Sequence, residues 1–352
     1  MNSSLSHTTI VERFVARSHR FLFESCDPTV IPLLRIGLGS LLMIVAATWL
    51  RDAELWFTDA GVLRSDTVDK LSRFPHWSLL SLLPSTALVA QICLVMMFVQ
   101  AAMLTIGFYG RFQAACLFLW LVSFQHRNPL LCDGEDTLFR LLAFSFVFLP
   151  LDARMSIRSR LAGFCRSMRS ASRVIGPADC WALRLVQFQM AVIYASATWN
   201  KLQGSSWHDG SAMLLVTQMT DHYGRMGLPA FIVENVLLMK MLTWSVLVIE
   251  GFLPIGLWFR STRRIALLLG IALHLGIEWT MHLFLFEWVM ILGLLSFARA
   301  EDNLFAAVYR RLSQNQSCAV GSDLKNSSIT PATFSRPDSD GCVPSGPKSS
   351  AV

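Results

Sequence analysis

The composition of the chain is typical of a protein with lipid-facing surface rather than of a water-soluble one. Of its 352 residues, 53% are hydrophobic and only 15% are charged, and the mean hydropathy is +0.48. A soluble chain carries about 25% charged residues, so the composition excludes disordered, collagen-like and small disulfide-stabilised proteins. The formal charge of +6 fits either a nucleic-acid-binding protein or a membrane protein with arginine-rich cytoplasmic loops. The positions of the arginines decide between these two classes.

Residues 1–31 are predicted to form an interfacial segment that precedes the membrane domain. Between residues 10 and 24, apolar side chains are interleaved with Arg13, Arg17 and Arg20. This pattern is typical of an amphipathic helix that lies on the inner leaflet. No cleavage site with small residues follows the first long apolar stretch, so we expect that stretch to be a retained helix and not a signal peptide.

Residues 32–300 are predicted to form an all-α polytopic transmembrane bundle. A spanning helix needs about 20 mostly apolar residues, and somewhat fewer inside a bundle. Eight stretches qualify, of which the third and fourth are the shortest. They are residues 32–50, 87–107, 111–125, 138–151, 182–200, 236–259, 265–281 and 283–298.

The arginines predict the orientation of the bundle, because cytoplasmic loops carry an excess of basic residues. With the N-terminus inside, most of the 30 lysines and arginines fall on the cytoplasmic side. Eight spans then place both termini in the cytoplasm, in a bacterial inner membrane, and leave no role for nucleic acid. The arginines concerned include Arg13, Arg17, Arg20, Arg111, Arg154, Arg158, Arg160, Arg166, Arg169, Arg173, Arg260, Arg263 and Arg264.

The last segment, residues 301–352, is expected to be a mostly disordered cytoplasmic tail. From about residue 313 it is rich in Ser, Pro, Gly and Asn and shows almost no apolar periodicity. Of the 8 cysteines, only Cys132 is expected to face outward, so no disulfide is expected on that side.

Three sets of polar residues near the predicted spans could carry chemistry. The first is Asn200-Lys201-Leu202, with Trp207 beyond it, at the outer end of the fifth span. A lysine among aromatic and apolar neighbours loses hydration, which favours a neutral amine that can act as a general base. The alternative is a lysine at a helix C-terminus that extends to the interface and interacts with the helix dipole.

The second set is the outer turn that leads into the fourth span. Asp133 or Asp136 could cap that helix, and Arg127 could pair with these acids. His126 is either a proton carrier or a turn residue. A functional interpretation is that the turn binds a polar substrate group or tunes the pKa of a neighbour. The residues concerned are His126, Arg127, Asn128, Asp133, Glu135 and Asp136.

The third set lies on the last three predicted spans. His274, Glu278 and His282 follow at steps of four residues, so they share one helix face, and Glu250 and Glu287 lie on the neighbouring spans. Eight rises of about 1.5 Å separate the two histidines, which is too far for a shared metal ion on a straight helix. We therefore predict an interior hydrogen-bonded ladder and no metal site.

The motifs together resemble the HTTM family, the membrane domain shared with vitamin K-dependent gamma-carboxylase. The order and spacing of the motifs carry the resemblance, over roughly residues 10–300. The motifs are Arg35-Ile-Gly-Leu-Gly39, Phe57-Thr-Asp-Ala-Gly61, His126-Arg-Asn-Pro129, Asp133-Gly-Glu-Asp136, Leu149-Pro-Leu-Asp152, Asn200-Lys-Leu202 with Trp207 and Gly210, and His274-Leu-Gly276.

The resemblance implies a reaction at the outer face. In the carboxylase, the lysine at the position of Lys201 deprotonates vitamin K hydroquinone, and oxygen then yields a strong base that allows CO2 to add to a glutamate side chain. Reduced vitamin K or menaquinol, with CO2 and O2, are the cofactors implied. This chain has Gly134-Glu135-Asp136 where the carboxylase has an Asn-His pair, and only a short tail follows residue 300.

From these departures we expect a carboxylase-like, quinol-using enzyme that acts on a small peptide or a lipid-borne substrate, rather than a processive protein carboxylase. Lys201 and His126 are the candidate catalytic residues. The alternative is a non-enzymatic membrane factor that assists peptide maturation or a partner enzyme. A transporter is less favoured, because two symmetric halves with broken helices are not evident.

Overall fold

The computed structural model describes residues 3–23, 30–71, 77–152, 156, 181–219 and 224–299. The chain divides into one compact unit, Met1–Phe305, and a second, Ala306–Val352, which lies outside the described residues together with the predicted disordered tail. Apart from one isolated bridge between Gly224 and Met281, the regular structure of the described ranges is helical. The predicted all-α fold class is confirmed.

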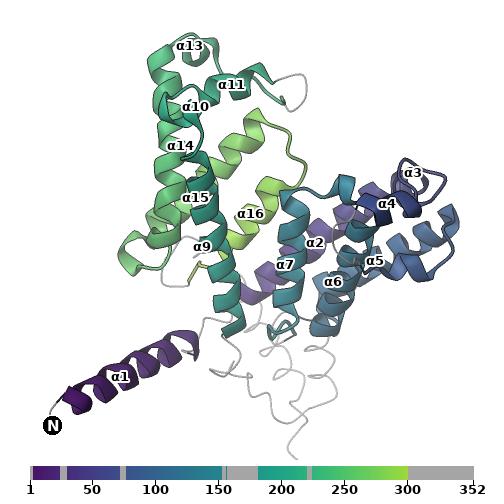
Figure 1. Ribbon diagram of the computed structural model, residues 1–352, viewed down its shortest axis with the longest axis horizontal. Helices are drawn as coiled ribbons and strands as arrows, with labels where there is room; N and C mark the ends of the chain where they lie inside the picture. The colour runs from purple at the N-terminus through teal and green to yellow at the C-terminus, as the bar shows by residue number, and fades with distance from the viewer. Residues whose placement is uncertain are drawn as a thin grey trace, which may run out of the picture. The chain divides into compact units, whose positions relative to one another are not determined.

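Each of the eight predicted spans contains one long helix (Figure 1). The second of these helices ends at Gly107, which adopts the left-handed conformation typical of a helix C-cap. The helices are α2 (Val30–Arg51), α5 (Ala87–Ile106), α6 (Gly110–Arg127), α7 (Gly134–Phe146), α9 (Trp181–Lys201), α14 (Val236–Gly256), α15 (Arg260–Thr280) and α16 (Phe286–Leu295).

Three of these helices, α2, α5 and α14, are long and apolar enough to cross a membrane. On α5, an exposed stripe runs along the helix at steps of three and four residues, through Leu88, Ile92, Val95 and Val99. A water-soluble protein would bury such a stripe, whereas lipid is its natural surrounding. The chain is therefore an integral membrane protein, while the crossing of all eight helices stays a prediction.

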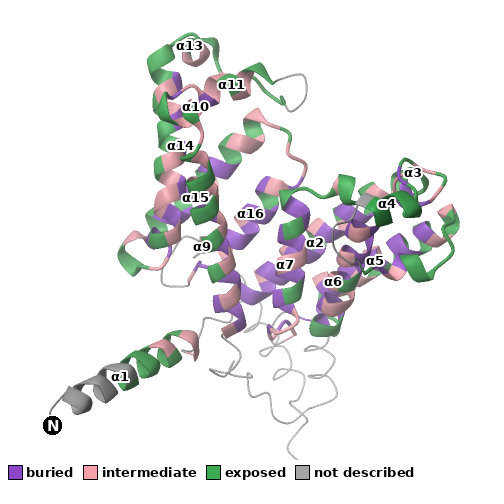
Figure 2. Cartoon of the chain, in the orientation of Figure 1, coloured by how far each residue is buried: buried purple, intermediate pink, exposed green. Residues whose placement is uncertain are grey.

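The buried residues concentrate where the long helices meet (Figure 2). α2 packs mainly against α5 and also contacts α7 and α16, and α9 packs mainly against α14. Leu38, Leu42, Leu94, Met97 and Leu104 are completely shielded on the α2 and α5 faces. α2 is thus surrounded by protein along much of its length, whereas α5 and α14 leave one side open.

Short helices occupy the connections between the long ones. α3 (Ala53–Phe57), α4 (Ser65–Leu71) and the 3-10 helix η1 (Leu79–Leu82) lie between α2 and α5, and the 3-10 helix η2 (Pro129–Leu131) joins α6 to α7. Between α9 and α14 lie α10 (Ser205–His208), α11 (Ala212–Gln218) and α13 (Ala230–Val233).

The predicted N-terminal amphipathic segment forms helix α1 (Ser3–Phe23). Its last part contacts the bundle, since the ring of Phe21 packs against Phe188 and Trp258 and the Arg184 guanidinium lies 4.8 Å from the Phe21 ring centroid. Phe14 and Val15 are exposed. An apolar exposed face on a basic helix suits a membrane surface, and its placement on the inner leaflet stays a prediction.

A buried arginine joins three chain segments at the end of the bundle where α2 begins. Nη1 of Arg35, which is fully shielded, donates to the carbonyl of Leu151 at 2.8 Å. Asp152, next in the chain, accepts from the N–H of Gly110 at 2.9 Å, at the start of α6. A Cβ at Gly107 would lie 2.2 Å from Nη1 of Arg35, so only glycine fits there.

We expect Gly107→Ala to destabilise the protein strongly. Gly107 has a φ of +75°, where an L-residue costs about 1–2 kcal/mol, and the methyl group would displace Arg35 from its buried hydrogen bond. The melting temperature in detergent should fall by several degrees. Gly227→Ala is the matched control, because nothing lies within 4 Å of a Cβ at that position. Equal melting temperatures for the two variants would contradict this account of Arg35.

Candidate functional site

Lys201 ends α9 in an ion pair with a carboxylate of the neighbouring helix. Its Nζ bonds to both carboxylate oxygens of Glu250, which lies in α14. The Lys201 side chain is 26% exposed and that of Glu250 is 8% exposed, so the amine is accessible and the carboxylate is buried. The packing of α9 against α14 therefore joins two residues that the sequence placed in separate sets.

An aromatic ring lies beside the Lys201 amine because the chain turns sharply after α9. The centroid of the Trp207 ring is 5.1 Å from Nζ of Lys201, within the range of a cation–π contact. The turn is closed by the N–H of Gly204, which donates to the carbonyl of Lys201 at 3.0 Å. A Cβ at Gly204 would lie 3.1 Å from the Trp207 ring, so the glycine permits the close return of the chain.

A second network is buried across three helices. The Tyr194 hydroxyl lies 2.6 Å from Nε2 of His274, and Nδ1 of His274 bonds to Oε2 of Glu287. Tyr194 belongs to α9, His274 to α15 and Glu287 to α16. The sequence analysis named the histidine and the glutamate but not Tyr194, since an aromatic residue in an apolar span gives no signal of a polar role.

His274 and Glu278 do not bond to each other along one face of α15, as the predicted ladder would require. His274 bonds to α9 and α16, whereas Glu278 pairs with Arg225 in the loop before α13. The N–H of Arg225 also donates to the carbonyl of Thr280 at 3.1 Å, which holds that loop against the end of α15. His282 lies beyond the helix and is exposed. His274 and Glu278 therefore each join α15 to another part of the chain.

The turn between α6 and α7 is held by its own polar residues. Asn128 donates to the carbonyl of Trp56 at 2.9 Å, and the N–H of Asp133 donates to Oδ2 of Asp136 at 3.0 Å. The predicted cap of the fourth helix is thereby confirmed. Glu135, in the first turn of α7, accepts from the N–H of Leu285 at 3.1 Å and ties this turn to the start of α16.

Arg127 pairs with Asp59 in the loop after α3, and not with the acids of its own turn as the sequence suggested. Nη2 of Arg127 donates to Oδ1 of Asp59 at 3.0 Å, and Nη1 donates to the carbonyl of Leu63 at 2.9 Å. The same Asp59 oxygen accepts from the hydroxyl and the N–H of Ser65. These hydrogen bonds from Ser65, with the charge of Arg127, hold the pKa of Asp59 below its ordinary value. Asp59 therefore stays ionised.

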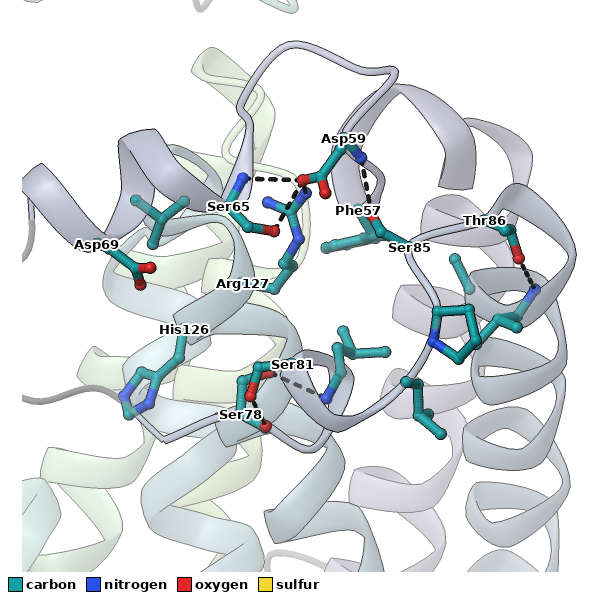
Figure 3. Close-up of a pocket in the computed structure, with 16 residues that line it drawn as sticks. Phe57, Asp59, Ser65, Asp69, Ser78, Ser81, Ser85, Thr86, His126 and Arg127 are labelled. Atoms are coloured by element: carbon teal, nitrogen blue, oxygen red, sulfur yellow. Dashed lines mark hydrogen bonds and ion pairs between the residues drawn. The ribbon is translucent and has the colours of Figure 1, made fainter.

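Asp59, Ser65 and Arg127 line a pocket of about 410 Å³, shown in Figure 3. Its wall carries the Asp59 and Asp69 carboxylates, the guanidinium of Arg127 and several serine hydroxyls. His126 lies at the wall, with Nδ1 2.8 Å from the carbonyl of Trp77. Since a carbonyl only accepts, Nδ1 of His126 is the donor in this hydrogen bond. Lys201 is not among the residues that line this pocket.

The sequence profile of the HTTM domain matches residues 23–301. The chain belongs to the HTTM family. No curated protein and no solved structure matches it. The resemblance predicted from the motifs is confirmed, with boundaries close to the predicted membrane domain of residues 32–300.

Most HTTM motif residues of the chain make contacts that connect helix ends. Arg35 and Asp152 join α2, α6 and the segment after α7, while Asn128 bonds to a carbonyl of α3 and Arg127 fixes the loop after α3. Lys201 differs from Arg35, Arg127 and Asn128, which are buried, since its side chain is partly exposed. The amine of Lys201 is therefore accessible.

We expect Cys132 to react unusually slowly with maleimides. Cys132 is exposed as a residue, but its Sγ atom faces the carbonyl of Gln125, and the partial desolvation of the thiol raises its pKa to about 11, with a smaller contribution from the charge of Asp136. The Sγ atom lies 3.4 Å from the carbonyl of Gln125. Because the thiolate is the reacting species, labelling at pH 7.5 should be roughly two orders of magnitude slower than for an ordinary thiol and should rise about tenfold per pH unit.

Mass spectrometry of the peptide that contains Cys132 would measure this rate. The denatured protein is the control, because unfolding restores an ordinary thiol. Equal rates in the folded and the denatured protein at pH 7.5 would contradict the prediction.

Proposed function

We propose that this HTTM protein is a carboxylase-like membrane enzyme that uses a quinol at the outer face, with Lys201 as general base. The observation that carries the proposal is the pair of Lys201 and Glu250, with the ring of Trp207 5.1 Å from the amine. An amine that bonds to a buried carboxylate and is also accessible to solvent is suited to exchange protons with a bound molecule.

The pair can supply a base in a simple way. A proton lies between the amine of Lys201 and the carboxylate of Glu250, and its transfer to the carboxylate leaves a neutral amine and a neutral acid. The neutral amine can then accept a proton from a substrate hydroxyl. Glu250, which is 8% exposed, is positioned to hold the first proton away from water. In this proposal Lys201 is the catalytic residue and Glu250 its proton partner.

The surroundings of Lys201 fit reduced vitamin K or menaquinol. Trp207 supplies a flat aromatic surface beside the amine. Aromatic side chains stack on planar rings, so this tryptophan would favour a quinol near Lys201. When bound, the quinol would be the reductant that O2 oxidises to the epoxide, and this oxidation would supply the driving force for the addition of CO2. The chain supplies the base and the apolar, aromatic wall.

The pocket beside His126 is proposed to hold the polar part of a small peptide or a lipid-borne substrate. Its volume of about 410 Å³ lies in the range of small-molecule sites. Arg127 and Asp59 give the wall fixed charges of both signs, and His126 adds an imidazole ring. Asn128, Asp133, Glu135 and Asp136 are proposed to position this wall, since their bonds hold the adjoining turn.

The alternative function is a non-enzymatic membrane factor for peptide maturation or for a partner enzyme. The observation that favours it is that Lys201 bonds to both oxygens of Glu250, a geometry that would also suit a structural ion pair. In that case a partner protein would co-purify with the chain, and the extracted protein would contain no quinone.

The proposed topology has eight spans, with both termini on the cytoplasmic side of a bacterial inner membrane. We expect a membrane-impermeant maleimide to label Asp66→Cys in intact cells, because Asp66 is exposed in the predicted outer loop. Ser261→Cys, exposed at the start of α15, should be labelled only after permeabilisation. Equal labelling of both variants in intact cells, read from the modified peptides, would refute the orientation.

The catalytic proposal is tested with the purified protein, reduced menaquinone or vitamin K hydroquinone, and oxygen. We expect epoxide to form, and Lys201→Ala to lower the rate by at least about 100-fold, as is usual for loss of a general base. Lys240→Ala is the matched control. Lys240 is also partly buried, against Gly210 in the connection between α9 and α14, and takes no part in the proposed reaction.

Product analysis by chromatography would decide this test. If folded wild-type protein forms no epoxide, even with bicarbonate and a glutamate-rich peptide, the enzyme proposal fails and the membrane factor is favoured.

A further inference from the structure

The buried chain of Tyr194, His274 and Glu287 has the order hydroxyl, imidazole, carboxylate. The three residues are exposed by only 1%, 3% and 1%. Oε1 of Glu287 has no hydrogen-bond partner within the described part of the chain, and Oε2 bonds to His274. Packing alone would not require such a set, because apolar side chains could fill the same space at lower cost.

The order of the bonds fixes the direction in which protons are donated. An ionised Glu287 accepts from Nδ1–H of His274, which leaves the lone pair on Nε2. The Tyr194 hydroxyl, 2.6 Å away, then donates to Nε2. A carboxylate that orients an imidazole against a hydroxyl is the arrangement that activates hydroxyl groups in proteins.

This arrangement can take up one proton without placing it in an apolar region. The O–H bond of Tyr194 breaks as a bond forms between that hydrogen and Nε2 of His274. The tyrosine oxygen accepts the incoming proton in its place. The result is a neutral tyrosine and an imidazolium of His274 beside the carboxylate of Glu287, so the positive charge formed on the imidazole is balanced.

Tyr194, His274 and Glu287, which we call the triad, lie near Lys201, the candidate base. Tyr194 and Lys201 are separated by seven residues of α9, which places them on nearly the same face about 10 Å apart along the axis. Glu250, whose carboxylate bonds to Lys201, lies on α14, and α14 is the main packing partner of α9, the helix that carries Tyr194.

We propose that Tyr194, His274 and Glu287 form a second acid–base unit, which receives the proton that leaves the Lys201–Glu250 pair after substrate deprotonation. This role rests on the function proposed for Lys201. The proton enters at Tyr194 and is held by His274. Glu287 orients the imidazole and balances its positive charge.

The first test follows the tyrosine hydroxyl directly and needs no substrate. The chain has only 4 tyrosines, so 3-fluorotyrosine gives a simple fluorine NMR spectrum in which Tyr194→Phe identifies the resonance of interest. We expect Glu287→Gln to shift the Tyr194 resonance, although Glu287 bonds to His274 and not to the phenol. Tyr109, which is exposed, serves as the internal reference.

Two controls separate transmission through His274 from a change of charge alone. Glu278→Gln removes an equal charge one turn from His274 on α15, where the carboxylate pairs with Arg225, and should leave the Tyr194 resonance in place. In a His274→Gln background, Glu287→Gln should produce no further shift. A Tyr194 resonance that does not respond to Glu287→Gln, or a shift that persists without His274, overturns the proposal.

The second test uses the quinol assay. Tyr194→Phe keeps the ring and removes only the hydroxyl, so kcat should fall about 100-fold while KM for reduced menaquinone stays unchanged. Wild-type kcat in Tyr194→Phe overturns the triad. If the wild type forms no epoxide, the proposed function fails separately, and the fluorine shift still decides whether the triad activates Tyr194.

Discussion

Polar groups inside an apolar helical bundle have little access to water, so most of them must find a partner within the protein. This constraint determines how the helices of the chain are held together. Arg35 of α2 bonds to the segment after α7, Lys201 of α9 pairs with Glu250 of α14, and His274 of α15 joins α9 to α16. Because each bond joins different elements, satisfying the polar groups also fixes which helices are adjacent.

Structure and chemistry are therefore difficult to separate in this protein. Removal of one partner from a buried polar pair leaves the other unsatisfied, which destabilises the fold as well as removing a functional group. The loss of function in an Arg35 or Glu250 variant would say little without a measurement of folding. Tyr194→Phe is more informative, since it keeps the packing of the ring and changes a single hydrogen bond.

The two acid–base groups differ in their access to solvent. Lys201 is 26% exposed beside Trp207, whereas Tyr194, His274 and Glu287 are almost completely shielded. A substrate can reach the first group but not the second. That difference suits the proposal that the first group reacts with a bound molecule and the second stores or moves a proton.

The sequence alone located the long helices and indicated the family of this protein, because the signals for both are local. Apolar run length located the eight long helices, and the spacing of Asp133 and Asp136 located a helix cap. Partners across helices could not be predicted in the same way: Arg127 bonds to Asp59 rather than to its neighbours, and Lys201 meets Glu250. Periodicity tells which face of its own helix a residue occupies. Only the packing of all the side chains decides which helix faces that residue and which of its turns lies at the same level. The bond between Tyr194 and His274 therefore became evident only from the tertiary structure.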